Sequence, residues 1–424
     1  MLDIAALLIA LTALFSFINY HLFRLPTTIG VMLISLVLSV SLLGLGEFGY
    51  FTVSEQMEAL VRSIDFDEVL LHGMLSLLLF AGAMHVDLDQ LSRGAWPIGV
   101  LATVGVLAST FIVGLGAWGV FRFAGLEVPL IYCLLFGSLI SPTDPIAVLG
   151  ILKRIGAPRS LEIKITGESL FNDGVAVVIF TILLTVAVGG EEIGPLDIGW
   201  LFVEEALGGA LFGLVLGLLG FAMLKTVDSY HVEVLITLGL VMGGYALATR
   251  LHLSGPIAMV VAGLMIGNHG RTLAMSTTTV DHLDTFWEIV DEILNAVLFV
   301  LIGFEIVLLT FEGSYFLAAG LMIPLVLLTR LVCVGVPVTV MRRRFGFEFA
   351  PYAITVLTWG GLRGGISVAL ALVLPEGPAR DEILVATYVM VLFSVVVQGL
   401  TIGPLVRYTL RKSPAEPVTS QEAL

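Results

Sequence analysis

Charged residues are scarce in this chain. They make up 13% of its 424 residues, whereas soluble domains keep about a quarter of their residues charged. Hydrophobic residues reach 58%, and the mean hydropathy is +1.05. This composition excludes an ordinary soluble domain and predicts an all-α polytopic membrane protein.

Basic residues and cysteines are also few. The 20 Lys and Arg against 34 Asp and Glu give a net charge of −14. The chain shows no basic face of the kind that a nucleic-acid-binding protein needs. Cys133 and Cys333 lie in apolar segments, which favours packing over a disulfide or metal pair. No HExxH-like cluster occurs, which counts against an intramembrane enzyme, and we expect no cofactor besides the transported ions.

The N-terminus has no basic region before its apolar run, which continues to about Leu22. A cleaved signal peptide would carry such a region, so a retained first span is predicted. With neither a transit peptide nor a long polar tail, we expect the plasma (inner) membrane of a prokaryote.

Long apolar runs are abundant. A membrane span needs about twenty mostly apolar residues. Thirteen segments approach this length, namely 3–22, 27–45, 66–86, 95–121, 128–150, 163–188, 198–224, 232–249, 255–268, 286–310, 314–341, 350–374 and 382–408. Of the 20 basic residues, 14 then fall in one set of loops and the tail, 4 in the opposite loops and two within spans. The positive-inside rule predicts the N-terminus outside and the C-terminus inside, with Arg342–Arg344 fixing topology and touching anionic lipid.

Two predicted spans contain helix breakers at mid-membrane depth. Residues 141–145 read SPTDP in the fifth span, and residues 359–365 read WGGLRGG in the twelfth. Prolines remove amide donors and glycines weaken a helix, so unwound backbone is expected at both. The breaks occupy the middle of spans 4–6 and 11–13, which predicts inverted repeats with crossed discontinuous helices. A static proline kink and close glycine packing are the alternatives.

Polar groups form a band in the sixth span, where residues 167–174 read GESLFNDG before a VAVVIF run. On a helix, Glu168 stacks on Asn172 and Ser169 on Asp173 at i,i+4 spacing. Charges at this depth need a partner, a cavity or an ion. The band therefore predicts an ion or proton site.

Buried charges elsewhere restrict that site. Arg330 lies in an apolar span and needs an anionic partner, for which Glu168 is the natural choice. Asp144 and Arg363 can neutralise the opposed helix ends at the two breaks. Asp173 is then left without a fixed cationic partner. Burial favours a protonated carboxyl and a bound cation favours the carboxylate, so cation and proton compete for one group, as in an antiporter.

These motifs make the chain similar to the monovalent cation:proton antiporter family, in the bacterial sodium/proton exchanger (NhaP-type) branch. The resemblance rests on residues 141–145, 167–173 and 359–364, with support from 24–26 and 254–258. It implies a homodimer in the lipid membrane, in which a core of six spans moves against a dimerisation domain.

The resemblance also implies roles for the site residues. It assigns cation coordination to Asp173, to the Ser169 hydroxyl and to the backbone around Thr143, with Asn172 steadying the site and Glu168 paired to an arginine. An Asn–Asp pair marks the branch expected to exchange one cation for one proton without net charge.

The expected division of the chain follows from the repeats. It comprises 1–90 and 229–312 for dimerisation, 91–190 and 313–410 for the core, 191–228 as a linking span, and 411–424 as a short cytoplasmic tail.

Some alternatives remain open. Ala81 stands where some microbial relatives carry a glutamate that reaches the ion, so a K⁺-preferring K⁺/H⁺ antiporter is the alternative to exchange of Na⁺ or Li⁺. A cation channel would use the same site without coupling to protons. An intramembrane enzyme with Glu168 and Asp173 as acid and base is disfavoured, because catalysis does not require two broken helices.

Overall fold

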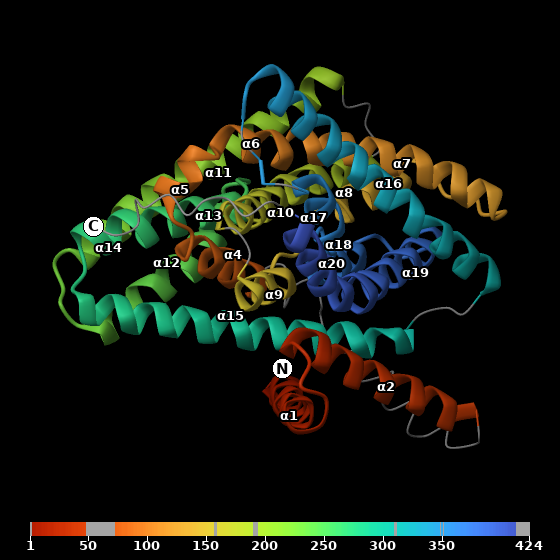
Figure 1. Cartoon of the computed structure of the whole chain (residues 1–424), viewed down its shortest axis with the longest axis horizontal. Coiled ribbons are helices and arrows are strands. Elements are labelled where there is room, and N and C mark those ends of the chain that lie inside the picture. Colours follow the sequence, from red (N-terminus) through yellow and green to blue (C-terminus); the bar gives the residue numbers. More distant parts are fainter. Residues whose placement is uncertain are drawn as a thin grey trace.

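The computed structural model describes residues 2–47, 73–156, 159–189, 194–308, 312–347, 349–350 and 352–412. This part of the chain is helical, and its one β-type pairing is an isolated bridge between Asp144 and Leu362. The all-α prediction is confirmed for the described residues. Figure 1 shows long helices packed against one another.

The N-terminal half contains α1 (Leu2–Ile18), α2 (Thr27–Glu47), α4 (Leu75–Met84), α5 (Leu88–Arg93), α6 (Ala95–Ala102), α7 (Val104–Phe123), α8 (Leu130–Leu139), α9 (Ile146–Ile155) and α10 (Arg159–Val188). The C-terminal half contains α11 (Pro195–Leu224), α12 (Tyr230–Arg250), α13 (Gly255–Met265), α14 (Arg271–Leu273), α15 (Thr277–Glu305), α16 (Gly313–Arg344), α17 (Ala353–Trp359), α18 (Gly365–Leu372), α19 (Pro378–Phe393) and α20 (Gly399–Lys412). Short π-helical turns join some of them, including η3 (Ile266–Gly270) and η5 (Ser394–Gln398).

Membrane-spanning length is reached by a subset of these helices. Within the described residues, eight helical stretches are long and apolar enough to cross a membrane, and α4 and α8 are shorter apolar helices. The chain is therefore a multi-pass membrane protein, while the count of thirteen spans stays a prediction. Part of the predicted span 66–86 lies outside the described residues, as does the tail beyond Lys412. Arg411 and Lys412, placed in the tail by the sequence, form the last turn of α20.

Both predicted breaks are present as interruptions between short helices. In the first break, α8 ends at Leu139 and α9 begins at Ile146, with Pro145 as the N-cap residue of α9. In the second, α17 ends at Trp359 and α18 begins at Gly365. The two interruptions meet, because the Asp144 amide donates to the Leu362 carbonyl at 2.8 Å.

Some helices approach each other closely at positions where a glycine has no side chain to keep them apart. A Cβ on Gly137 of α8 would lie 2.2 Å from the Thr110 carbonyl oxygen of α7, and one on Gly213 of α11 would lie 2.4 Å from the Ala258 carbonyl oxygen of α13. In a bilayer, where lipid is as apolar as leucine, such close van der Waals packing holds helices together. Gly137 therefore lets α7 lie directly against α8, the helix that precedes the first break.

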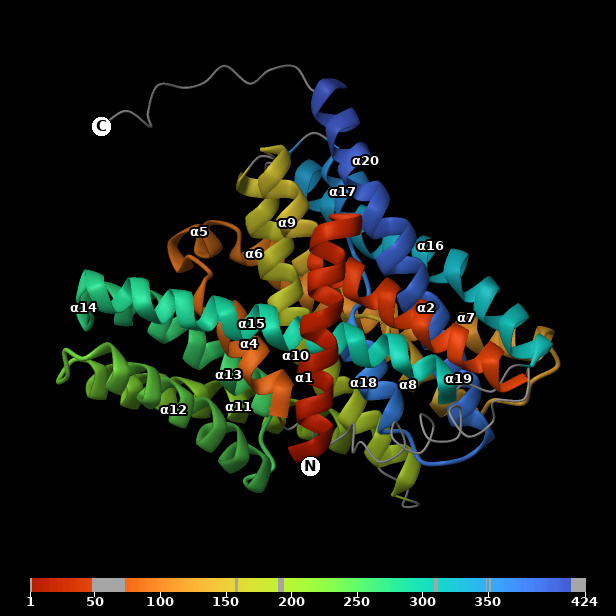
Figure 2. The same cartoon turned by 90° about the horizontal axis from the view of Figure 1, so that it is seen from below.

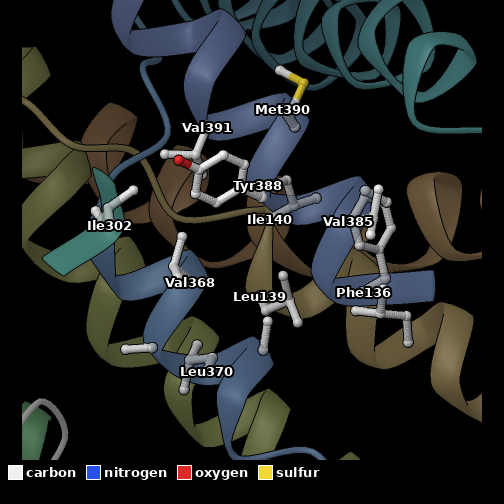
Figure 3. Close-up of a cluster of buried hydrophobic side chains, with 14 of the residues drawn as sticks. Phe136, Leu139, Ile140, Ile302, Val368, Leu370, Val385, Tyr388, Met390 and Val391 are labelled. Atoms are coloured by element: carbon white, nitrogen blue, oxygen red, sulfur yellow. The ribbon is translucent and has the colours of Figure 1, made fainter. Parts of the chain in front are cut away.

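The buried apolar side chains of the described residues form several clusters. One joins α8, α18 and α19 and includes Phe136, Val368 and Tyr388 (Figure 3). A second gathers α4, α12, α13 and the first half of α15 around Trp287, and a third joins α9, α17 and α20. Cys133 and Cys333 are buried and free, as predicted for packing residues.

Candidate ion-binding site

The polar band lies on α10, beside the first break. Glu168, Ser169, Asn172 and Asp173 are all buried, and Asp173 is the most exposed of them at 8%. Because α10 runs uninterrupted from Arg159 to Val188, the four side chains lie on neighbouring turns of one helix. The sequence therefore placed this band correctly on a continuous helix.

Thr143 connects the first break to α10. The Asn172 amide donates to Thr143 Oγ1 at 2.9 Å, while its Oδ1 accepts from the Thr143 backbone N–H at 3.4 Å. Thr143 Oγ1 and Ser169 Oγ also share a hydrogen bond of 3.0 Å. Thus the structure brings Thr143, Ser169 and Asn172 together, and Asn172 satisfies a backbone donor that the break removes from a helix.

Arg363 lies in the second break and contacts the first. Its guanidinium donates to the carbonyl oxygens of Ser141 and Pro142 at 2.6 and 2.7 Å. These carbonyls follow the end of α8, where backbone oxygens lack helical donors and the helix dipole is negative. A buried cation at this position suits the charge-balancing role predicted for Arg363.

Asp144 makes the reciprocal contact. A Cβ added to Gly364 would lie 2.6 Å from Asp144 Oδ2, so the carboxylate sits directly against the residue that precedes α18. The start of a helix carries a partial positive charge, which a carboxylate stabilises. Only glycine leaves room for this approach at position 364.

Glu168 and Arg330 lie in contact between α10 and α16. The Arg330 guanidinium donates to Glu168 Oε1, and it also donates to the Leu357 carbonyl oxygen at 3.3 and 3.4 Å. The side chains of Glu168 and Arg330 are 2% and 11% exposed. Gly361 leaves the space that Arg330 fills, since a Cβ there would lie 2.7 Å from Arg330 Nε.

Asp173 differs from these charged neighbours. Within the described residues its carboxylate has no hydrogen bond, and it interacts electrostatically with Asp144 and Arg363. Neighbouring oxygens come from Ser169, four residues earlier and so one turn away on the same helix, and from Thr143, which is hydrogen-bonded to Ser169. Carboxylate, hydroxyl and carbonyl oxygens are the donors that hard cations prefer.

Two polar residues of the last span were missed by the sequence reasoning. The Ser394 hydroxyl accepts from the Arg363 backbone N–H at 2.8 Å and donates to Gln398 Oε1 at 2.8 Å. The Gln398 amide then donates to the Trp359 carbonyl oxygen at 3.0 Å. Both residues belong to the π-helical turn η5 and satisfy backbone groups freed by the second break. Their i,i+4 spacing within a valine run was the available signal.

Ala81 lies in α4, fully buried. The adjoining Gly82 faces α10, because a Cβ there would lie 4.0 Å from Leu170 Cδ1. The Ala81 carbonyl oxygen is bonded to His85 Nδ1 at 2.8 Å. This part of α4 therefore lies near the polar band, and the side chain at position 81 contributes no oxygen to it.

Comparison with known proteins adds independent information. The profile of the family described as "Sodium/hydrogen exchanger, transmembrane" matches residues 7–408. The chain is 54% identical over 418 residues to the Na(+)/H(+) antiporter NhaP of Pseudomonas aeruginosa, covering 98% of this chain and 99% of that protein. It is 35% identical over 388 residues to the Na(+)/H(+) antiporter NhaH of Halobacillus dabanensis, covering 90% and 91%. Its fold matches the sodium proton antiporter MjNhaP1 from Methanocaldococcus jannaschii with a TM-score of 0.71 at 19% identity, over 96% of this chain and 97% of that one.

Proposed function

Because this chain belongs to the sodium/hydrogen exchanger family, whose members are transporters and not enzymes, we propose that it exchanges Na⁺ for H⁺ across a membrane. The single observation that carries the mechanism is the environment of Asp173. Its carboxylate is buried beside two helix breaks, and it forms no hydrogen bond with the described residues. Such a group can carry a proton or a cation in turn.

The cation would be held by oxygens. The Asp173 carboxylate supplies the charge, and Ser169 and Thr143 supply neutral oxygens from α10 and from the first break. Burial favours the protonated carboxyl, whereas a bound cation favours the carboxylate. Each ligand therefore displaces the other, and this competition couples the two fluxes.

The other charges of the site are held in place by direct contacts. Glu168 is paired with Arg330, and Arg363 donates to two backbone carbonyls. Asn172 is neutral and bonded to Thr143. If only Asp173 changes its occupancy, one monovalent cation moves against one proton, and the exchange transfers no net charge.

The surrounding architecture is part of the proposal. We propose thirteen spans, with the N-terminus outside and the C-terminus in the cytoplasm, in the inner membrane of a bacterium. Two inverted repeats, within 91–190 and 313–410, would form the core, and 1–90 with 229–312 would form the dimerisation domain. Support comes from the meeting of the two breaks, the asymmetry of loop charges and the fold match.

Transport in proteoliposomes tests the function. An outward or inward Na⁺ gradient should drive proton movement, read from an internal pH dye, and Asp173→Asn should abolish it. Asp281→Asn, which neutralises an exposed carboxylate at the start of α15, serves as the matched control and should transport normally. Persistent exchange by Asp173→Asn would overturn the assignment of the carrier.

A K⁺/H⁺ antiporter is the second candidate, favoured by the alanine at position 81, which leaves one acidic ligand out of the site. Comparing Na⁺, Li⁺ and K⁺ gradients of equal size decides between them. Cation flux without proton movement would instead indicate a channel.

A further inference from the structure

An apolar groove lies on the side of the molecule where α16, α17 and α20 meet. It has a volume of about 580 Å³, which falls within the roughly 300–1,000 Å³ of ordinary ligand pockets. Six of its lining residues are Leu331, Thr355, Thr358, Trp359, Thr401 and Tyr408. None of these residues takes part in the cation site described above.

This groove opens toward the lipid. On α16, a spanning helix, Leu328 is 62% exposed, and Leu331 and Val332 beside it are also exposed. Exposed leucine and valine on a spanning helix face hydrocarbon. The natural occupant of an apolar groove on this surface is therefore an acyl chain.

One end of the groove is basic. Tyr408 lines it, and the Lys412 ammonium lies 4.4 Å from the centre of the Tyr408 ring. Arg411 precedes Lys412, and α16 ends in Arg342–Arg344. Figure 2 shows α17 and the C-terminal end of α20 at the same end of the molecule. By the loop charges this is the cytoplasmic side, where anionic lipid headgroups are attracted to basic residues.

The groove also touches the inner half of the second break. The Trp359 indole donates to Thr401 Oγ1 at 2.9 Å, and the Trp359 carbonyl accepts from Gln398 of the network that holds Arg363. A chain lying in the groove would therefore pack against α17, the helix that leads directly into the break.

We propose that this groove binds an acyl chain of an anionic phospholipid of the inner leaflet, with the lipid phosphate held by Lys412. The apolar wall selects the chain, and the basic end selects a negative headgroup over a zwitterionic one. The groove is separate from the cation site. Lipid binding in the groove can therefore be tested whichever ion the protein carries.

Native mass spectrometry of the purified full chain tests the proposal, using phosphatidylglycerol and phosphatidylcholine of the same acyl chains as probes. Wild type should retain phosphatidylglycerol in preference. Lys412→Gln should weaken this retention about fivefold, which corresponds to about 1 kcal/mol for one basic residue near a membrane. Lys225→Gln is the matched control, because Lys225 also stacks on an aromatic ring at the end of a helix, with its Nζ 6.0 Å from Phe221.

The groove itself is tested at one position. Thr355 lines it and is exposed, so Thr355→Phe should fill it and lower retention of phosphatidylglycerol, whereas Thr355→Ala should retain it. If Thr355→Phe does not fold, brominated phosphatidylglycerol provides a second measurement. Bromine on the acyl chain should quench the fluorescence of Trp359 in wild type, and this part of the quenching should be lost in Trp359→Phe. Equal retention of both lipids, an unchanged Lys412→Gln or an absent Trp359 component would each overturn the proposal.

Discussion

Removing one partner of the Glu168–Arg330 pair should destabilise the protein unequally, depending on which partner is lost. In Glu168→Gln, Arg330 keeps its two hydrogen bonds to the Leu357 carbonyl and its 11% exposure to the surroundings. The loss is then one hydrogen bond to a charged group, or about 1.5–3 kcal/mol. In Arg330→Gln, the Glu168 carboxylate is only 2% exposed and loses its cation, which costs about 3–5 kcal/mol.

The double variant should recover part of the sum, because no buried charge is left without its partner. We expect a coupling free energy of about 1–3 kcal/mol from the cycle of single and double variants. Unfolding in mixed detergent micelles, followed by circular dichroism, gives the four free energies. Arg271 and Asp284 supply the matched control, since their side chains are 28% and 30% exposed and should couple by about 0.2–1 kcal/mol.

Two results would contradict this reasoning. Additive losses, within about 0.5 kcal/mol, would show that Glu168 and Arg330 do not stabilise each other. A larger loss for Glu168→Gln than for Arg330→Gln would show that the Leu357 carbonyl does not hold the guanidinium when the carboxylate is gone.

Three further outcomes are expected. Asp173→Asn should unfold at a similar denaturant concentration to wild type while losing cation-driven proton flux; a strongly destabilised variant would mean that the carboxylate is structural. Exchange in voltage-clamped proteoliposomes should be independent of membrane potential, because moving no net charge does no electrical work; a voltage-dependent rate would reveal a second titrating group. Ser394→Ala should lower the free energy of unfolding by about 1–3 kcal/mol, because the Arg363 amide and Gln398 lose their shared partner, and Ser394→Thr should restore it; equal stability of the two variants would show that the hydroxyl does not hold the break.

Local chemistry made the breaks and the polar band predictable from the sequence. Pro142 and Pro145 cannot continue a helix, and polar residues inside an apolar run must face one another or an ion. Partner choice was harder, because it depends on how distant helices approach. The contact between Arg330 and Glu168 followed from charge alone, whereas no local rule assigns Ser394 to the Arg363 amide thirty-one residues away. The number of spans is equally hard to derive, since short helices such as α4 fall below the usual spanning length.

The contacts between the two breaks bear on how alternating access can proceed. Arg363 donates to Ser141 and Pro142, and the Asp144 amide donates to Leu362, so each break satisfies backbone groups of the other. Rewinding either break would leave these groups unpaired, at about 1–3 kcal/mol for each buried donor or acceptor. Movement of the breaks as one unit with α10 leaves every one of these bonds intact. We therefore expect the site to be exposed to either side by rigid-body displacement of the broken helices together with Asp173, and not by refolding around a bound ion.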